Sequence, residues 1–298
     1  MNEADPLYSS FIINCVFNAF TAYTAIMLNI LTIHAVRKTL SLPKPLKTLL
    51  LSLAVSDLGV GLLAQPLYIA LMIRPTASST DTALNIIGLT FFIASFLTVV
   101  ALTVDRFLAI HLHLRYQELV THKRANAAAI SIWVLSVILP LFCLLSSLAK
   151  GLINIVVGLC FIITAVANCR IYCAVRHHKN QIQVLQMQVA GNSQVENAAR
   201  QRKSAVGTIC VYLVFLTCCL PKFCATVALK IYPSSVAVNA LRFYTGTLLF
   251  LNSSLNPVIY CWRMRPIRHA IKDVLQKVYF LLKSEQNCEN RKTLMEQI

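Results

Sequence analysis

The sequence predicts an all-α membrane protein: a seven-transmembrane helix bundle with an amphipathic eighth helix, its N-terminus outside. Of the 298 residues, 57% are hydrophobic and 13% are charged. Soluble domains carry roughly 25% charged residues. The mean hydropathy of +0.66 leaves too little polar surface to cover a water-soluble globule of this size. Seven apolar stretches, each of about 20 or more residues, alternate with short basic connections.

The first three predicted spans cover residues 11–36, 46–72 and 83–112. Each is long enough to cross a bilayer as a helix, which needs about 20 mostly apolar residues. The first span does not read as a cleavable signal peptide. Acidic residues Glu3 and Asp5 precede it instead of a basic region, and its apolar run is too long. We therefore expect it to be a true membrane helix.

The other four spans cover residues 127–148, 151–176, 204–229 and 238–261. Helices are expected throughout, because a helix satisfies its own backbone groups in lipid and the alternating pattern of a barrel is absent from the sequence. The fourth and fifth spans almost touch, so any extracellular lid between them is minimal. The polar inner segment 177–203 is the longest connection, and we expect it to extend the helices beside it.

Lysine and arginine residues set the orientation. With the N-terminus outside, 22 of the 27 lie on the inner side, in agreement with the positive charge of cytoplasmic segments. The net charge of +16 is explained in this way and does not indicate nucleic acid as a partner. We expect a short extracellular N-terminus at 1–10, the bundle at 11–261, and the amphipathic helix with a cytoplasmic tail at 262–298.

An amphipathic helix is expected directly after the seventh span, over residues 265–282. Apolar residues such as Ile267 and Ile271 fall on one face, while Arg268 and Lys272 fall on the other. A helix of this kind lies on the inner leaflet with its basic face toward anionic lipid. Membrane lipids are therefore expected partners.

Six polar side chains are functional candidates, because amide and charged groups at membrane depth are costly. An ionised carboxylate with hydroxyl and amide groups on neighbouring helices can hold a small cation and water. A hydrogen-bond network that only joins the helices accounts for the same residues equally well. The six residues are Asn29, Asp57, Ser95, Asn252, Ser253 and Asn256.

Two prolines and one charged pair complete the candidates. Pro221 in the sixth span and Pro257 in the seventh each remove a backbone hydrogen bond, so both helices are expected to kink and to offer a hinge. Asp105 and Arg106 place opposite charges at the inner end of the third span, followed by Tyr116. This pair alone indicates little, since arginine is common at the inner boundary.

Short motifs occur in the same order as the spans. They are Asn29 in span one, Leu53-Ala54-Val55-Ser56-Asp57 in span two, Asp105-Arg106-Phe107 at the end of span three, Trp133 in span four, Cys219-Leu220-Pro221 in span six and Asn256-Pro257-Val258-Ile259-Tyr260 in span seven. In this order and spacing, over about residues 10–280, the chain resembles the rhodopsin-like (class A) G-protein-coupled receptors.

This resemblance implies a multi-pass plasma-membrane receptor. It would bind an extracellular peptide, nucleoside or lipid within the bundle and activate a heterotrimeric G protein, with arrestin as a further partner. The resemblance also implies an internal sodium ion held by Asp57 and Ser95 with Asn252, Ser253 and Asn256, and otherwise no cofactor and no catalytic residue. The residues implied for activation and coupling are Asp105, Arg106, Leu114, Tyr172, Cys219, Pro221, Pro257 and Tyr260.

Departures from the family pattern narrow the branch. Asp81 stands where the family usually has its disulfide cysteine, and Thr164 replaces the span-five proline. Together with the short second outer loop, these departures resemble the melanocortin branch, with adenosine, cannabinoid and lysophospholipid receptors nearby. Asp81, Asn85 and Gly88 are the candidates for ligand binding. Gly88 stands where amine receptors have the aspartate that pairs with the ligand, so a biogenic amine is not expected.

The sequence also bears on three other functions. An intramembrane enzyme needs a nucleophile with a base, or metal ligands, at membrane depth, and Asp57 is the only deep acid. A transporter is typically built from repeats with broken helices at matching positions, which the sequence lacks. A signalling-deficient or constitutively active receptor is favoured by the unusual Phe107 and Cys219. It is also favoured by Gln201, which stands where many relatives have an acid that holds the equivalent of Arg106.

Overall fold

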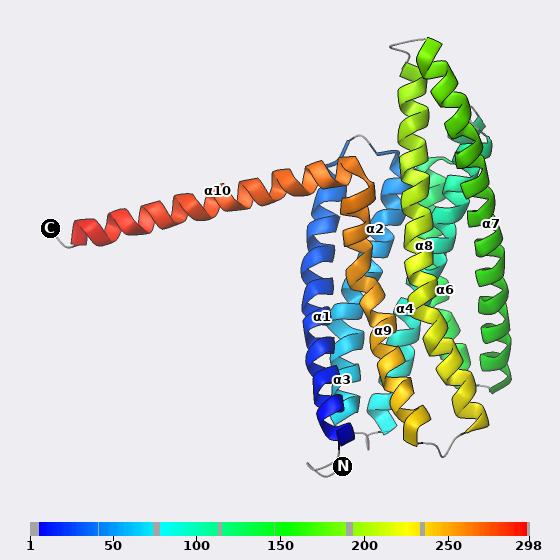
Figure 1. Cartoon of the computed structure of the whole chain (residues 1–298). Helices are drawn as coiled ribbons and strands as arrows, with labels where there is room; N and C mark the ends of the chain where they lie inside the picture. Colours follow the sequence, from blue (N-terminus) through cyan, green and yellow to red (C-terminus); the bar gives the residue numbers. More distant parts are fainter. Residues whose placement is uncertain are drawn as a thin grey trace.

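The computed structural model describes residues 6–40, 42–73, 78–112, 115–145, 147–188, 193–232 and 236–296. Within these ranges every regular element is a helix, and most of the helices pack side by side in one bundle (Figure 1). The elements are α1 (Pro6–Lys38), α2 (Lys44–Gly59), the π-helical turn η1 (Val60–Ala64), α3 (Gln65–Ile73), α4 (Ser78–His111), α5 (Tyr116–Leu119), α6 (His122–Leu145), α7 (Ser147–Gln188), α8 (Ser193–Ile231), α9 (Val236–Arg263) and α10 (Arg265–Glu296).

The second predicted span contains a π-helical turn, η1, between α2 and α3. The N–H group of Gln65 bonds to the carbonyl of Val60, five residues earlier. Pro66 follows directly, and a proline has no N–H group to give to the turn before it, which is a common cause of such a widened turn. The side chain of Gln65 is fully buried in the bundle at this point.

Seven helical spans form the bundle, as predicted. Six stretches are long and apolar enough to cross a membrane. The seventh predicted span is α9, which has a lower hydropathy because several asparagine, serine and threonine residues interrupt it. It packs against α1 and α8 in the bundle (Figure 1). The six stretches are Ser9–Lys38, Lys44–Ile73, Asp81–His111, His122–Leu144, Gly151–Arg176 and Ser204–Leu229.

Several helices extend beyond the predicted spans. α1 begins at Pro6, so half of the predicted N-terminal segment 1–10 is helical. α7 continues to Gln188 and α8 begins at Ser193, so the long inner connection extends both helices, as expected. α10 continues to Glu296, beyond the predicted end at residue 282, and points away from the bundle (Figure 1).

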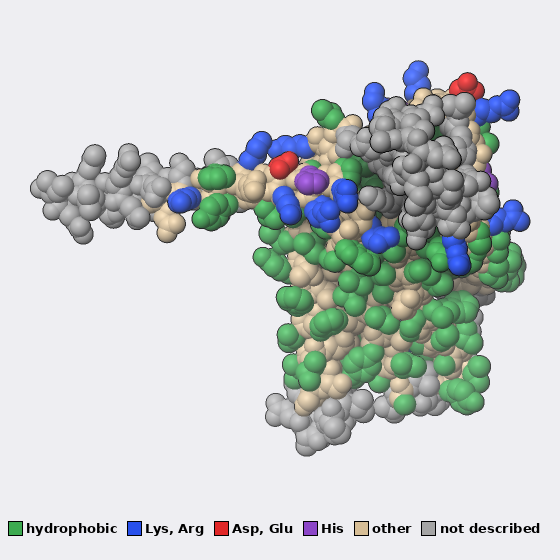
Figure 2. Space-filling view, turned by 45° about the horizontal axis from the view of Figure 1, so that its top comes forward, with side chains coloured by type: hydrophobic (Ala, Val, Ile, Leu, Met, Phe, Trp, Pro, Cys, Tyr) green, Lys and Arg blue, Asp and Glu red, His purple; other side chains and the backbone are tan. Residues whose placement is uncertain are grey.

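Aromatic side chains fill the centre of the bundle. The ring of Phe96 on α4 lies 5.8 Å from that of Phe215 on α8 and 4.4 Å from that of Phe161 on α7, measured between centroids. Cys219 on α8 is buried in the same core. Figure 2 shows apolar side chains covering the outside of the bundle, with Lys and Arg at the end from which α10 leaves. A lipid-facing belt below a positive cytoplasmic face has this appearance.

Gly246 on α9 is expected to be required for stability. A Cβ atom at this position would overlap the hydroxyl group of Tyr68, which donates to the backbone carbonyl of Phe243 at 2.6 Å. Gly246→Ala should therefore lower the free energy of unfolding by about 1–3 kcal/mol, as measured by thermal unfolding in detergent. Gly158→Ala is the matched control, because nothing lies within 4 Å of its Cβ position. Equal stability of the two variants would contradict this packing.

Candidate functional site

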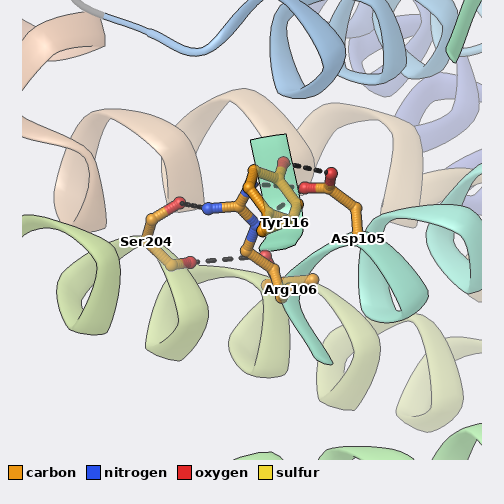
Figure 3. Close-up of polar contacts among 5 residues, drawn as sticks. Asp105, Arg106, Tyr116 and Ser204 are labelled. Atoms are coloured by element: carbon orange, nitrogen blue, oxygen red, sulfur yellow. Dashed lines mark hydrogen bonds and ion pairs between the residues drawn. The ribbon is translucent and has the colours of Figure 1, made fainter. Parts of the chain in front are cut away.

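A buried charged cluster lies at the inner end of α4 (Figure 3). Arg106 donates its Nε–H to the carboxylate of Asp105 at 2.9 Å, and its Nη2 donates to the same carboxylate oxygen. Both side chains are almost completely buried. Burying an ion pair is costly unless further hydrogen bonds satisfy the remaining polar atoms. The other contacts of Asp105 and Arg106 therefore decide how firmly the pair is held.

Tyr116 supplies one of these contacts. Its hydroxyl group donates to the second carboxylate oxygen of Asp105 at 2.7 Å (Figure 3). Burial, and next the negative charge of Asp105, raise the pKa of the Tyr116 phenol above its ordinary value. The hydroxyl group therefore keeps its proton and continues to donate. Since Tyr116 begins the one-turn helix α5, the second inner connection fixes the carboxylate beside Arg106.

Ser204 supplies the contact to the neighbouring helix. The Nη1 group of Arg106 donates to the hydroxyl oxygen of Ser204 on α8 at 3.3 Å (Figure 3). A neutral hydroxyl accepts more weakly than a carboxylate. The link between α4 and α8 is therefore weaker than the ion pair within α4. Movement of the inner end of α8 would break the hydrogen bond between Arg106 and Ser204 and leave the ion pair between Arg106 and Asp105 intact.

The second polar site surrounds Asp57 on α2, which is fully buried. Asn256 on α9 donates its Nδ2–H to the Asp57 carboxylate at 2.8 Å, and Ser253 on the same helix is a polar neighbour of Asp57. Asn29 on α1 donates to the backbone carbonyl of Ser253 at 2.9 Å rather than to Asp57 itself. The polar residues predicted from spans one, two and seven thus meet in one place.

Several buried oxygen atoms among the predicted polar residues have no hydrogen-bond donor among the residues that the structure describes. They are Oδ1 of Asp57, Oγ of Ser95, and Oδ1 of Asn29, Asn252 and Asn256. An unpaired buried acceptor costs about 1–3 kcal/mol. Carboxylate, amide and hydroxyl oxygens are also the ligands that hard cations take. This set of oxygen atoms therefore fits a small cation such as sodium.

Comparison with known proteins places these two sites in a family. The chain matches the family described as "7 transmembrane receptor (rhodopsin family)" over residues 28–152 and 150–260. The matched residues include both the Asp57 site and the Arg106 cluster. The chain belongs to the rhodopsin family of seven-transmembrane receptors.

The receptor is similar to melanocortin receptors. Melanocortin receptor 4 of Danio rerio is 23% identical over 287 residues, which cover 91% of this chain and 86% of the relative. Melanocortin receptor 5 of Homo sapiens is 25% identical over 266 residues, which cover 83% of this chain and 79% of the relative. The expected likeness to the melanocortin branch is confirmed. The expected likeness to adenosine, cannabinoid and lysophospholipid receptors stays a prediction.

Family membership also settles the general function. The protein is a G-protein-coupled cell-surface receptor, a multi-pass protein of the plasma membrane and not an enzyme. In general terms, its partners are an extracellular ligand and a heterotrimeric G protein. The enzyme and transporter alternatives considered from the sequence are therefore rejected.

Some residues predicted to act with Arg106 lie elsewhere in the receptor. Tyr172 on α7 is 53% exposed and faces away from the core. Tyr260 on α9 is buried in the core, and its hydroxyl group has no partner among the described residues. Leu114 and the side chain of Gln201 lie outside the described part of the chain. The cluster is instead completed by Tyr116 and Ser204.

The hinge candidates occupy the predicted helices. Pro221 lies within α8 and Pro257 within α9. Cys219, two residues before Pro221, is buried against the aromatic core. A thiol fills little space, so it offers little packing resistance when α8 bends at Pro221.

The three ligand-binding candidates share one face of α4, at positions i, i+4 and i+7. Asp81 is half-buried and Asn85 is exposed. Among the side chains that the structure describes, none forms a hydrogen bond or an ion pair with Asp81. Lys222, a basic residue in the outer half of α8, donates to the backbone carbonyl of Arg242 at 3.1 Å. A Cβ atom at Gly88 would meet only Leu84, at 3.9 Å, so a larger residue would fit there.

Sequence reasoning missed two sets of residues. Tyr116 was noted beside the Asp105–Arg106 pair but given no role, and Ser204 was not noted, because the importance of both depends on the fold bringing them to that pair. Buried amide and hydroxyl groups in the outer half of α1, α3 and α9 had a detectable signal. Asn14, Asn18 and Thr21 recur at helical spacing in the first span, which places them on one face.

Proposed function

We propose that the receptor binds an extracellular ligand in the outer half of the bundle and responds by activating a heterotrimeric G protein at its cytoplasmic face. The observation that supports this most directly is the buried cluster of Asp105, Arg106, Tyr116 and Ser204, which joins α4 to α8 at the inner end of the bundle. Such a cluster is a two-state element, because outward movement of α8 breaks one part of it.

Each residue of the cluster has a distinct part in the switch. Asp105 keeps Arg106 turned toward α4, and Tyr116 keeps Asp105 in place. Ser204 holds the inner end of α8 against Arg106. A ligand that binds more tightly when α8 is displaced shifts the population toward the open form. The exposed inner face then receives the G protein, and arrestin is a further partner for the same face.

Asp57 would hold a sodium ion in the closed form, together with Ser95, Asn252 and Asn256. These residues offer unpaired buried oxygens, and a bound cation would supply the positive charge that a fully buried carboxylate needs. Because the oxygens come from different helices, a sodium ion bound to all of them favours the packing in which those helices are close. Sodium is therefore expected to oppose activation.

A cell assay tests the receptor function. Second-messenger levels are measured with and without the receptor, across a range of surface expression, and then with panels of peptides, nucleosides and lipids. The relatives bear the name melanocortin receptor, so peptides are tested first. A receptor that reaches the surface but changes no messenger level under any condition would favour the signalling-deficient alternative and contradict the proposal.

Leu114 is expected to dock into the G protein. Leu114→Asp should reduce G-protein activation by about 10-fold or more, because an apolar anchor at the centre of an interface carries at least about 2 kcal/mol. The measurement is nucleotide exchange on the G protein in receptor membranes. Leu40→Asp is the matched control, since Leu40 is 95% exposed on the first inner connection. Unchanged activation with Leu114→Asp would exclude this residue from the interface.

A further inference from the structure

A third buried polar site, distinct from the Arg106 cluster and the Asp57 site, lies in the outer half of the bundle, where α1, α3 and α9 meet. It consists of Asn14, Asn18 and Thr21 from α1, Gln65 from α3 and Thr247 from α9, and is called the amide cluster below. None of these side chains is more than 5% exposed. Five buried polar side chains in an apolar bundle need an explanation, and the switch at Arg106 does not use them.

Hydrogen bonds fix the direction in which the amide groups point. Asn18 donates its Nδ2–H to the hydroxyl of Thr247 at 2.6 Å and to the backbone carbonyl of Asn14 at 2.9 Å. Gln65 donates its Nε2–H to the hydroxyl of Thr21 at 2.9 Å. An amide nitrogen must face a backbone carbonyl, so the group on Asn18 cannot be turned over. The amide oxygens therefore face away from these partners.

The two amide oxygens left over are acceptors without a donor. Oδ1 of Asn18 and Oε1 of Gln65 are buried, and no donor of the described residues reaches either of them. A network that only joined helices would be expected to pair all of its polar atoms. Two unpaired amide oxygens from different helices instead suit a ligand that is either a cation or a hydrogen-bond donor with N–H or O–H groups. Water and small monovalent cations have this chemistry.

The amide cluster is continuous with the Asp57 site. The hydroxyl of Ser254 on α9 donates to the backbone carbonyl of Thr21 at 2.9 Å, and the hydroxyl of Thr24 donates to Ser254 at 3.2 Å. The next residue of α9, toward its N-terminus, is Ser253, which neighbours Asp57. Polar groups therefore follow one another along the α1–α9 contact down to the carboxylate.

The outer end of the same contact is also polar. The hydroxyl groups of Ser10 on α1 and Tyr244 on α9 form a hydrogen bond, and both side chains are half-buried. Asn14 lies one helical turn further in and accepts from Thr247 at 2.7 Å. The row of polar groups thus begins near the outer face, passes through the amide cluster and ends at Asp57.

We propose that the amide cluster is a binding site for a small monovalent cation and its water. We also propose that cations from the outer face pass through this site, along α1 and α9, to reach Asp57. Asn18 and Gln65 provide the free oxygens, while Thr21 and Thr247 orient them. The passage of cations to Asp57 rests on the proposed sodium site at Asp57. Cation binding at the amide cluster does not rest on it.

Silver ion is a suitable probe, because it is a small monovalent cation that reacts with thiols. Thr21→Cys and Thr247→Cys are introduced separately into the full-length receptor. Both substitutions nearly preserve the size of the side chain. Thr217→Cys is the matched control, since Thr217 lies on the exposed, lipid-facing side of α8. Silver is applied from outside to intact cells. Thiols that remain free are then counted by a maleimide mass tag after denaturation, with the unsubstituted receptor as baseline.

Both cluster variants should lose their added thiol to silver at least about 10-fold faster than Thr217→Cys, because an ion does not enter lipid unaided. External sodium, compared with an equal concentration of choline, should slow the reaction by competing for the site. Reaction no faster than at Thr217→Cys would overturn the proposal and leave a dry contact between helices. Fast reaction without competition by sodium would overturn the cation assignment and leave a water site only.

A second measurement separates this proposal from the sodium proposal. Silver labelling reports access to the cluster whether or not sodium regulates signalling. If Asp57→Asn leaves the sodium response of signalling unchanged but the cluster thiols still react and are protected by sodium, the outer site stands and the Asp57 site falls. Asn18→Leu with Gln65→Met should abolish the protection by sodium in either case, because both free oxygens are removed.

Discussion

Asp105→Asn is expected to raise ligand-independent signalling by about 10-fold, the largest effect of any single substitution in the inner cluster. The change keeps the shape of the side chain but removes the charge that holds Arg106. Hydrogen bonds to charged groups contribute about 1.5–3 kcal/mol each, and about 1.4 kcal/mol already changes a two-state ratio 10-fold. The measurement is second-messenger output without ligand, plotted against surface expression.

Substitutions of the other two members of the cluster, Tyr116 and Ser204, are expected to have smaller effects. Tyr116→Phe removes the bond that positions Asp105, and Ser204→Ala removes the bond to α8. Each should raise basal output several-fold, since a single hydrogen bond contributes about 1 kcal/mol. Asp273→Asn, on the exposed part of α10, is the control and should change nothing. Flat basal output in all three cluster variants would show that these contacts do not hold the closed form.

The expected effect of Gln201 remains a prediction from the sequence. Gln201→Glu should lower basal output by offering Arg106 an acid. The structure identifies Ser204, one helical turn along α8, as the residue that Arg106 already contacts. Combining Gln201→Glu with Ser204→Ala therefore tests whether an acid at 201 can take over from the hydroxyl at 204.

Asp57→Asn is expected to abolish the response of the receptor to sodium completely. In the unsubstituted receptor, raising sodium at constant ionic strength, with choline as the replacement, should lower basal G-protein activation. The reason is that the unpaired oxygens around Asp57 favour a bound cation in the closed form. Replacing the only carboxylate of the site removes the charge that attracts the ion. The measurement is nucleotide exchange in receptor membranes, which needs no known ligand.

Asp81→Asn is the matched control for this experiment. It makes the same chemical change in a half-buried acid at the outer end of α4, for which the described residues provide no ion pair. It should keep the full sodium response. Ser95→Ala should weaken the response without removing it, because one neutral oxygen of the site is lost. A sodium response in Asp57→Asn equal to that of the unsubstituted receptor would exclude Asp57 as the binding residue.

The sequence alone determined the membrane class, the number of spans, their orientation and most members of the Asp57 site. Hydropathy and charge are local properties, so a span and its inner end can be recognised without knowing what it packs against. Asp57 and Asn256 could be singled out because any strongly polar group at membrane depth is unusual. Their hydrogen bond at 2.8 Å then joins two residues that were already candidates.

Only the tertiary structure decided which groups hold Arg106 and where the amide cluster forms. In a helix that is apolar on every side, the sequence pattern does not fix the face turned toward a neighbour, and each residue rotates that face by about 100°. Tyr172 and Ser204 show the consequence, since the predicted tyrosine is exposed and an unremarked serine contacts Arg106. The π-helical turn before Pro66 shifts the register again, so the burial of Gln65 beside Thr21 follows from packing rather than from spacing.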